Sequence, residues 1–182
     1  MKKLLGEGVF KLAGWTYQAD PSLLENKQVI IGFEHTSNMD AVLSLAIFAI
    51  LDIKIYTLIK KELFKGPLKP LLKAVGGIPV DRHNKGDIVG QMVKEFNTHD
   101  KFSLVIAPEA TRAKNSTDRK PIRTGFWHIA KAANVPIILM YAHAPTKSGG
   151  IFAKIYPTDL QEDLKLIKEK YAELGIDIKI PE

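Results

Sequence analysis

"QVIIGFEHTSNMDAVLSLAIFAIL", residues 28–51, contains two apolar runs that are separated by a short polar break. The first run, 28–34, is continuous and rich in β-branched residues, which is typical of a strand buried on both faces. The second run, 38–51, is long enough for a helix, and either Ser37 or Asn38 can cap its first turn. A strand followed by a turn and a helix is the repeating unit of folds with a parallel sheet.

The rest of the chain repeats this alternation. Further strands are predicted at 53–59, 77–80, 102–107, 135–142 and 150–157. Helices are predicted within 66–77, at 85–99, over 126–134 and from Asp159 onward, where Asp159 and Glu162 are spaced like a capping box. Because these strands lack a period-two polar pattern, both of their faces are expected to be covered by helices. The sequence therefore predicts one α/β domain over residues 1–182, with a mostly parallel central sheet flanked by helices.

The first residues predict a short amphipathic helix. Apolar side chains alternate with lysines in "MKKLLGEGVFKLAGWTY", residues 1–17, although three glycines weaken any helix there. The pattern suits a helix that lies in a membrane interface, and it suits equally a helix that packs on the domain. The sequence alone leaves both placements open.

The composition narrows the classes of function. A net charge of +6 predicts an anionic partner, which could be nucleic acid, a phosphorylated metabolite or an acidic lipid surface. The basic residues are spread along the chain and do not alternate with exposed aromatics, so nucleic acid is not the expected partner. The absence of cysteine excludes disulfides and thiolate chemistry. The histidines have no metal-ligand spacing, so no metal site is predicted, and no apolar run reaches the roughly 18 residues of a spanning helix.

Polar motifs follow three of the predicted strands. They are "HTSNMD" (35–40), "GGIPVDR" (76–82) and "APEATR" (107–112). The carboxyl ends of parallel strands meet at one edge of the sheet, and ligands in such folds bind beyond that edge. The three motifs are therefore expected to form one site.

The first motif offers a general base. His35 can take a proton near neutral pH, and Asp40 can orient its ring if His35 stays in the loop while Asp40 lies in the first turn of the helix. The simpler interpretation of this motif alone is a helix cap with an incidental histidine.

The other two motifs offer a binding site for an anion. Arg82 and Arg112 present guanidinium groups that suit phosphate, and Glu109 can accept hydrogen bonds from ligand hydroxyls, with Thr111 beside it. The competing interpretations are a tight turn with a surface ion pair between Asp81 and Arg82, and an ion pair within the loop that carries Glu109.

Four motifs in this order, the three above and "VPIILM" (135–140), resemble those of the glycerolphosphate and lysophosphatidic acid acyltransferase family. The resemblance covers most of the chain, from residue 14 to residue 141. It implies transfer of an acyl chain from acyl-CoA or acyl carrier protein, as co-substrate, to a hydroxyl of a glycerol-phosphate lipid acceptor. It also implies that the reaction needs no cofactor, no metal and no covalent enzyme intermediate.

Site roles follow from the same resemblance. His35 would deprotonate the acceptor hydroxyl and Asp40 would orient His35, while Arg82 and Arg112 would hold the phosphate and Glu109 the glycerol part. The family works at a membrane surface, so a cytoplasmic protein bound peripherally to the inner face of the membrane is expected. The alternative is a module of the same fold that binds phospholipid or acyl-CoA without catalysis.

Overall fold

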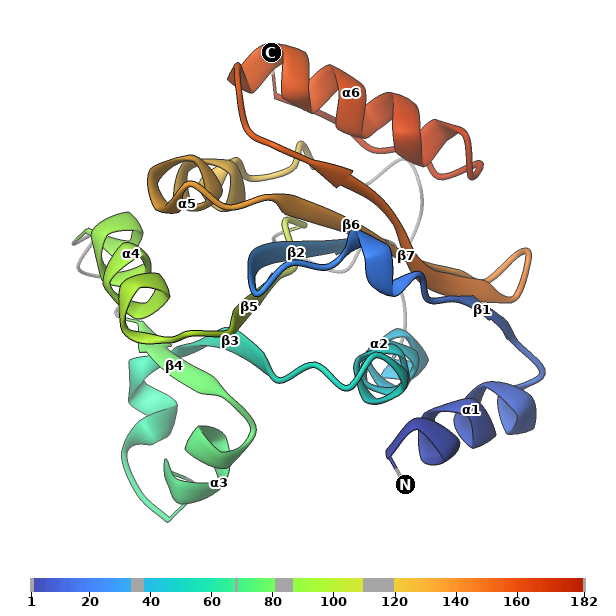
Figure 1. Cartoon of the computed structure of the whole chain (residues 1–182), viewed down its shortest axis with the longest axis horizontal. Coiled ribbons are helices and arrows are strands. Elements are labelled where there is room, and N and C mark those ends of the chain that lie inside the picture. Colours follow the sequence, from blue (N-terminus) through green and yellow to red (C-terminus); the bar gives the residue numbers. More distant parts are fainter. Residues whose placement is uncertain (1, 34–37, 68, 81–86, 110–119, 182) are drawn as a thin grey trace.

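The apolar runs of the sequence form a seven-stranded sheet at the centre of the molecule (Figure 1). The structure is a computed structural model that describes residues 2–33, 38–67, 69–80, 87–109 and 120–181. The strands are β1 (Thr16–Gln18), β2 (Lys27–Phe33), β3 (Ile55–Lys60), β4 (Gly77–Val80), β5 (Phe102–Ile106), β6 (Ile137–His143) and β7 (Ser148–Ile155). Their order across the sheet is β1-β7-β6-β2-β5-β3-β4.

The sheet is mostly parallel, which confirms the predicted fold class. β2 pairs in parallel with β5 and β6, and β3 pairs in parallel with β4 and β5. β7 is the exception, because it runs antiparallel to β6 after a short turn and then pairs in parallel with β1. The carboxyl ends of β2, β3, β4, β5 and β6 therefore lie at the same edge of the sheet.

Helices cover the sheet in two layers (Figure 1). One layer contains α1 (Lys2–Ala13), α2 (Asn38–Ile50) and α3 (Lys69–Ala74). The other contains α4 (Ile88–Thr98), α5 (Gly125–Ala133) and α6 (Leu160–Ala172). The short 3-10 helices η1 (Pro21–Leu23) and η2 (Lys61–Phe64) follow β1 and β3.

The central strands have no polar face because both faces are buried. In β2, Ile30 packs with the α1 and α2 layer, whereas Val29 and Ile31 pack with the opposite layer. All three side chains are fully buried. This explains why the first strand appears in the sequence as a continuous apolar run.

Aspartate side chains cap the N-terminal ends of α4 and α6. The side chain of Asp87 accepts a hydrogen bond from the main-chain N–H of Gly90 at the start of α4. The side chain of Asp159 accepts hydrogen bonds from the N–H groups of Gln161 and Glu162 at the start of α6, as the predicted cap requires.

The N-terminal helix packs on the domain and also leaves an apolar surface uncovered. Phe10 is 1% exposed, and Gly6 lies so close to α2 that a Cβ atom there would come within 2.5 Å of the carbonyl of Ala46. On the outer side, Leu4 is 72%, Leu5 67% and Leu12 91% exposed. The helix can therefore pack on the domain and at the same time present apolar side chains to a membrane interface.

The predicted extent of this helix, residues 1–17, is wrong at its C-terminal end. The helix ends at Ala13, and Gly14 turns the chain with φ +68, a conformation that glycine adopts without strain. The next residues, Thr16–Gln18, form β1 at the edge of the sheet. None of the described helices has the length and hydropathy needed to cross a bilayer.

Candidate active site

Asp40 lies in the first turn of α2 and is buried, with 3% of its surface exposed. The hydroxyl of Ser44 donates a hydrogen bond of 2.7 Å to the main-chain carbonyl of Asp40, one turn earlier in the helix. A buried carboxylate is costly unless hydrogen-bond donors surround it. Its position in the first turn of α2 is the one that the predicted base and orienting pair requires.

An apolar pocket of about 320 Å³ lies beside Asp40, and we call it the α2 pocket. Its walls come from α2 and from the ends of the neighbouring strands, with side chains that include Leu45, Phe48, Ile55 and Met140. Gly32 in β2 keeps this wall open, since a Cβ atom there would lie 3.2 Å from the Cγ atom of Met140.

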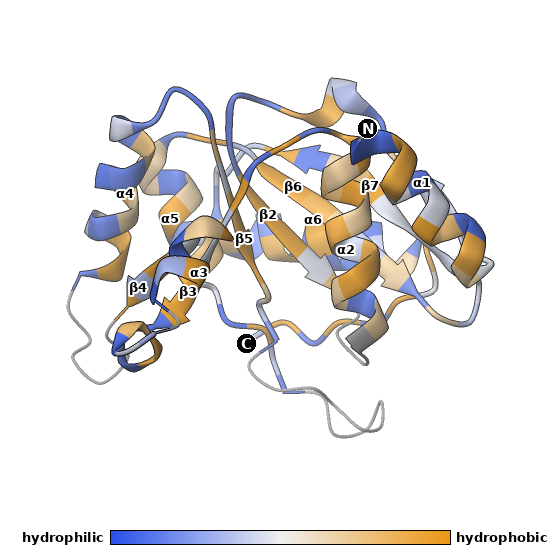
Figure 2. Cartoon of the chain, turned by 90° about the horizontal axis from the view of Figure 1, so that it is seen from below, coloured by the Kyte–Doolittle hydropathy of each residue, from blue (hydrophilic) through white to orange (hydrophobic). Residues whose placement is uncertain are grey.

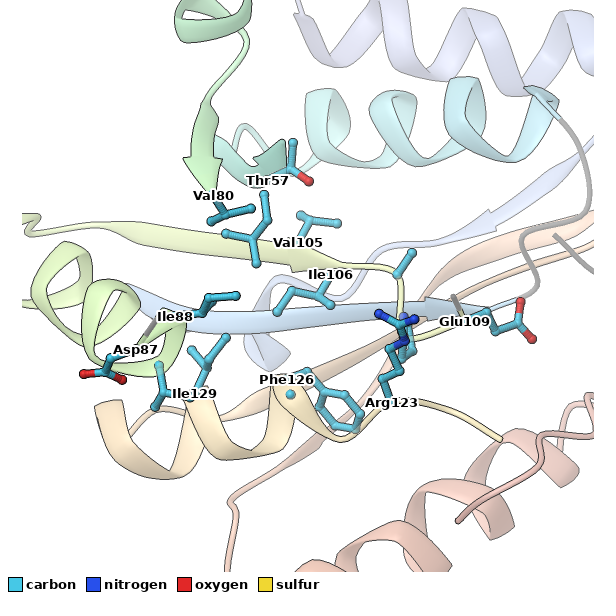
Figure 3. A pocket seen from close by; sticks show the side chains of 15 residues that line it. Thr57, Val80, Asp87, Ile88, Val105, Ile106, Glu109, Arg123, Phe126 and Ile129 are labelled. Atoms are coloured by element: carbon cyan, nitrogen blue, oxygen red, sulfur yellow. The ribbon is translucent and has the colours of Figure 1, made fainter. Parts of the chain in front are cut away.

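A second pocket of about 740 Å³ lies on the other face of the sheet (Figure 3), and we call it the α5 pocket. Val80, Ile88, Ile106, Phe126 and Ile129 supply apolar walls from β4, α4, β5 and α5. The picture shows the charged groups at the two ends: Arg123 and Glu109 at one end and Asp87 at the other. Both pockets have volumes that are typical of small-molecule sites.

The two pockets share a wall at the end of β5. Thr57, Val105, Ile106 and Ala107 line both of them. Val105 and Ile106 are only half-buried, because neither helix layer closes over this end of the strand. The carboxyl end of β5 therefore separates two apolar pockets that open at the same edge of the sheet.

Arg123 is held at this edge through its main chain. Its N–H donates a hydrogen bond of 3.1 Å to the carbonyl of Pro108, and the N–H of the preceding Ile122 donates to the carbonyl of Lys179. The first bond brings Arg123, just before α5, against the segment that follows β5, and the second brings Ile122 against the C-terminal segment. In Figure 3 the guanidinium group of Arg123 lies over the end of β5, and the carboxylate of Glu109 points away from it.

Tyr171 of α6 supports the ends of β2 and β6 from below the site. Its hydroxyl donates hydrogen bonds to the carbonyls of Met140 at 2.7 Å and Ile31 at 3.3 Å, and its ring packs edge-on against Phe33. Burial raises the pKa of Tyr171 well above its usual value, the hydrogen bond to Met140 opposes this, and the charge of Glu109 adds to the rise. Sequence analysis missed this residue, because a tyrosine in an amphipathic helix has no distinguishing pattern.

The structure describes two of the predicted site residues. Asp40 lines the α2 pocket and Glu109, which is half-buried, lines the α5 pocket. The other four predicted residues lie outside the described residues; they are His35, Arg82, Thr111 and Arg112.

The described neighbours of these four show which segments meet. Phe33 and Asp40, which flank His35 in sequence, both line the α2 pocket. Val80, two residues before Arg82, lines the α5 pocket together with Glu109. The strands that carry the three motifs therefore end at the same edge of the sheet, and the described residues around the motifs line two pockets there. Arg123 lies at the same edge. Among the described residues, no group of three His, Cys, Asp or Glu side chains is arranged to hold a metal ion.

Comparison with known proteins identifies a family and similar solved structures. A model of the acyltransferase family matches residues 16–142. The crystal structure of the 1-acyl-sn-glycerophosphate (LPA) acyltransferase PlsC from Thermotoga maritima matches with a TM-score of 0.64 and 12% sequence identity, covering 96% of this chain and 78% of that chain. At this identity the likeness establishes the fold alone. The curated proteins contain no significant sequence match.

Proposed function

Because the chain belongs to the acyltransferase family, we propose that it moves a fatty acyl chain from a thioester donor to a hydroxyl of a glycerol-phosphate-type lipid. The donor is acyl-CoA or acyl carrier protein. The observation that carries the proposal is the position of Asp40, a buried carboxylate in the wall of an apolar pocket, five residues after the predicted base His35. The solved structure that shares this fold is that of a 1-acyl-sn-glycerophosphate acyltransferase, which supports the same acceptor class.

In the proposed reaction His35 accepts the proton of the acceptor hydroxyl as the oxygen attacks the thioester carbonyl. The carbon–sulfur bond then breaks, and the leaving thiolate takes the proton back from the imidazolium, so that the products are an ester and a free thiol. Asp40 orients the imidazole and stabilises its charged form. Main-chain N–H groups at the start of α2 would stabilise the oxyanion, because the amino end of a helix leaves such donors unpaired.

The acceptor phosphate is assigned to the arginines. We propose that Arg82 and Arg112 hold it, with Glu109 and Thr111 contacting the glycerol part. Two observations support this: the strand that precedes Arg82 and the residue Glu109 line the same pocket, and Arg123 adds a further guanidinium group there.

The two apolar pockets suit a reaction between two molecules that each carry an aliphatic chain. The α2 pocket adjoins Asp40, so we assign the acyl chain of the donor to it. The α5 pocket has Arg123 and Glu109 at its mouth, so we assign to it the chain of a phosphate-bearing acceptor. Each buried methylene group would contribute about 0.8 kcal/mol to binding. This favours a lysophospholipid over glycerol phosphate as acceptor.

We also propose that the protein works in the cytoplasm, bound peripherally to the inner face of the membrane. The three exposed leucines of α1 support this location, because they keep apolar surface in water unless a bilayer covers them.

The test measures release of free thiol from long-chain acyl-CoA and, separately, from acyl carrier protein. Lysophosphatidate and glycerol 3-phosphate serve as acceptors, and the acylated product is identified by mass. Thiol release is expected only when an acceptor is present. The Asp40→Asn variant is expected to lose about 10²- to 10⁴-fold in turnover, the range of a general base that is no longer supported.

Asp52→Asn is the matched control, because Asp52 is exposed and pairs with Lys2 at the far end of α2. It should keep wild-type turnover. Full turnover in Asp40→Asn or in His35→Ala would refute the mechanism. Tight binding of acyl-CoA and lysophospholipid with no turnover for any acceptor would instead favour the non-catalytic binding module.

A further inference from the structure

The positive charge of the chain is concentrated in one part of the fold. Residues 60–76, which contain η2 and α3, include five lysines and a single acidic residue, Glu62, and so carry +4 of the net charge of +6. All five lysines are exposed to solvent; they are Lys60, Lys61, Lys65, Lys69 and Lys73. Among the described residues, no salt bridge joins any of these five lysines to a carboxylate.

The same segment exposes apolar side chains among these lysines. Leu63 is 52%, Leu71 59% and Val75 54% exposed. Single exposed apolar residues are common on soluble proteins, but a cluster surrounded by charge of one sign indicates an interaction surface.

α2 adds a second group of exposed apolar side chains. Met39 is 47%, Val42 46% and Leu45 58% exposed, although the opposite side of this helix is buried in the core. In the part of the chain that the structure describes, twelve large apolar residues are exposed; with the three leucines of α1, nine of them lie on α1, α2, η2, α3 or the residue just after α3. α4, α5 and α6, in the other layer, contribute only Leu166 to these twelve.

These elements lie on the same side of the sheet in both views (Figures 1 and 2). Figure 2 shows α1, α2 and α3 facing the viewer, with hydrophobic residues among hydrophilic ones on each of them. We call the exposed side chains of α1, α2, η2 and α3, with Val75, the lysine–leucine face. Lys2, Lys3 and Lys11 of α1 are also exposed, so basic residues occur at both ends of this face.

The lysine–leucine face is continuous with the α2 pocket. Leu45 is exposed on the face and also lines the pocket. Ile55 and Thr57 of β3, the strand that leads into η2, line the pocket from the other side. Leu45 therefore gives an aliphatic chain an apolar path from the lysine–leucine face into the α2 pocket.

We infer that the lysine–leucine face docks on an anionic lipid bilayer, with η2 and α3 as its main electrostatic anchor and the leucines of α1 and α2 inserted into the interface. Lysines near an anionic membrane surface are attracted to it, and apolar side chains between them gain by burial in the acyl region. An acidic protein partner would satisfy the lysines but would leave the broad apolar surface on three separate helices in water. The inference names the surface that the proposed peripheral location requires.

The first experiment measures sedimentation of the full chain with vesicles of phosphatidylcholine alone and of phosphatidylcholine with phosphatidylglycerol. Binding to the anionic vesicles is expected to be at least ten-fold tighter and to weaken as salt is added. The variant Lys65→Gln/Lys69→Gln/Lys73→Gln, which we call the α3 variant because two of its changes lie in α3, is expected to lose at least ten-fold of the affinity for anionic vesicles. The variant Leu4→Ser/Leu5→Ser/Leu12→Ser is expected to lose affinity for both kinds of vesicle.

The control Lys101→Gln/Lys165→Gln/Lys168→Gln removes the same charge from exposed sites away from the lysine–leucine face. It should bind vesicles within two-fold of the wild type. Equal losses in this control and in the α3 variant would overturn the inference, because net charge and not the face would then decide binding. Absence of vesicle binding together with binding to acidic acyl carrier protein would also overturn it.

The inference and the proposed function fail in different ways. Asp40→Asn should bind vesicles like the wild type while losing turnover, whereas the α3 variant should keep turnover on a water-soluble, short-chain acceptor while losing vesicle binding. Circular dichroism and thermal unfolding of each variant show whether it is folded. A face variant that unfolds is replaced by Leu71→Ser/Val75→Ser, which changes only exposed positions.

Discussion

The tyrosine that joins α6 to the sheet makes a sharp test of how the site is supported. Tyr171 is fully buried, and its hydroxyl is a donor to two main-chain carbonyls at the ends of β2 and β6. Tyr171→Phe keeps the ring and its packing against Phe33 but leaves both carbonyls without this donor. A buried polar group that loses its partner costs about 1–3 kcal/mol, so a loss of about 2 kcal/mol is expected.

For a chain of this size, that loss corresponds to a fall in Tm of about 4–8 °C. Calorimetry or circular dichroism at neutral pH would measure it. Tyr156→Phe is the matched control, because Tyr156 is exposed and its hydroxyl donates a hydrogen bond to the side chain of Glu25. That variant should change stability by less than about 0.5 kcal/mol. A Tm for Tyr171→Phe within 1 °C of the wild type would refute the reasoning, since the hydroxyl would then contribute nothing.

The pH dependence of the same pair of proteins gives an independent check. Burial raises the pKa of Tyr171 above its value in the unfolded chain, which is about 10. The unfolded state therefore loses the phenol proton first, and stability that is fully present below about pH 10 declines as the pH rises further. The phenylalanine variant lacks this decline, so the stability difference between the two proteins should shrink above about pH 10. A difference that stays constant would contradict the buried, neutral phenol.

Two further changes test the packing of the helix layers. Asp163→Ala should destabilise the protein by about 3 kcal/mol or more in urea unfolding. The reason is that the Asp163 carboxylate accepts hydrogen bonds from the indole of Trp127 and from the N–H and hydroxyl of Thr158. A loss below about 1 kcal/mol would mean that these donors find other partners. Gly6→Ala should cost about 1–3 kcal/mol and speed hydrogen exchange in α1, since its Cβ would press on a carbonyl of α2. Gly8→Ala on the same helix has open space, so it should be neutral or stabilising by up to about 1 kcal/mol, and equal effects of the two would refute the close contact.

The central strands could be predicted from sequence because burial on both faces leaves an unmistakable apolar run. β2 and β5 appear as such runs, and the predicted boundaries differ from the observed ones by a residue or two. β1 could not be predicted, because Thr16–Gln18 is exposed and its strand conformation depends on pairing with β7, which is far away in sequence. The capping of α6 by Asp159 was predictable because it depends on residues within one turn.

The position of Asp40 and Glu109 at one edge of the sheet was predictable, but the shape of the pockets beside them was not. Connectivity alone indicated that Asp40 and Glu109 follow parallel strands. It did not indicate that they line pockets on opposite faces, which depends on the helices that cover each face. The expectation of basic residues spread along the whole chain was too coarse, because residues 60–76 alone contain five lysines. The structure adds that all five are exposed and that Lys69 and Lys73 are one helical turn apart in α3.

The end of β5 acts as a partition between two chambers. Under the proposed assignment of one lipid chain to each chamber, this partition constrains how selectivity for chain length can change. A bulkier residue at Ile106 narrows both chambers together, so a gain of discrimination toward one lipid chain alters acceptance of the other. Phe48 borders one chamber and Ile129 the other. Independent tuning of the two substrates is therefore available from the helices and not from the strand between them.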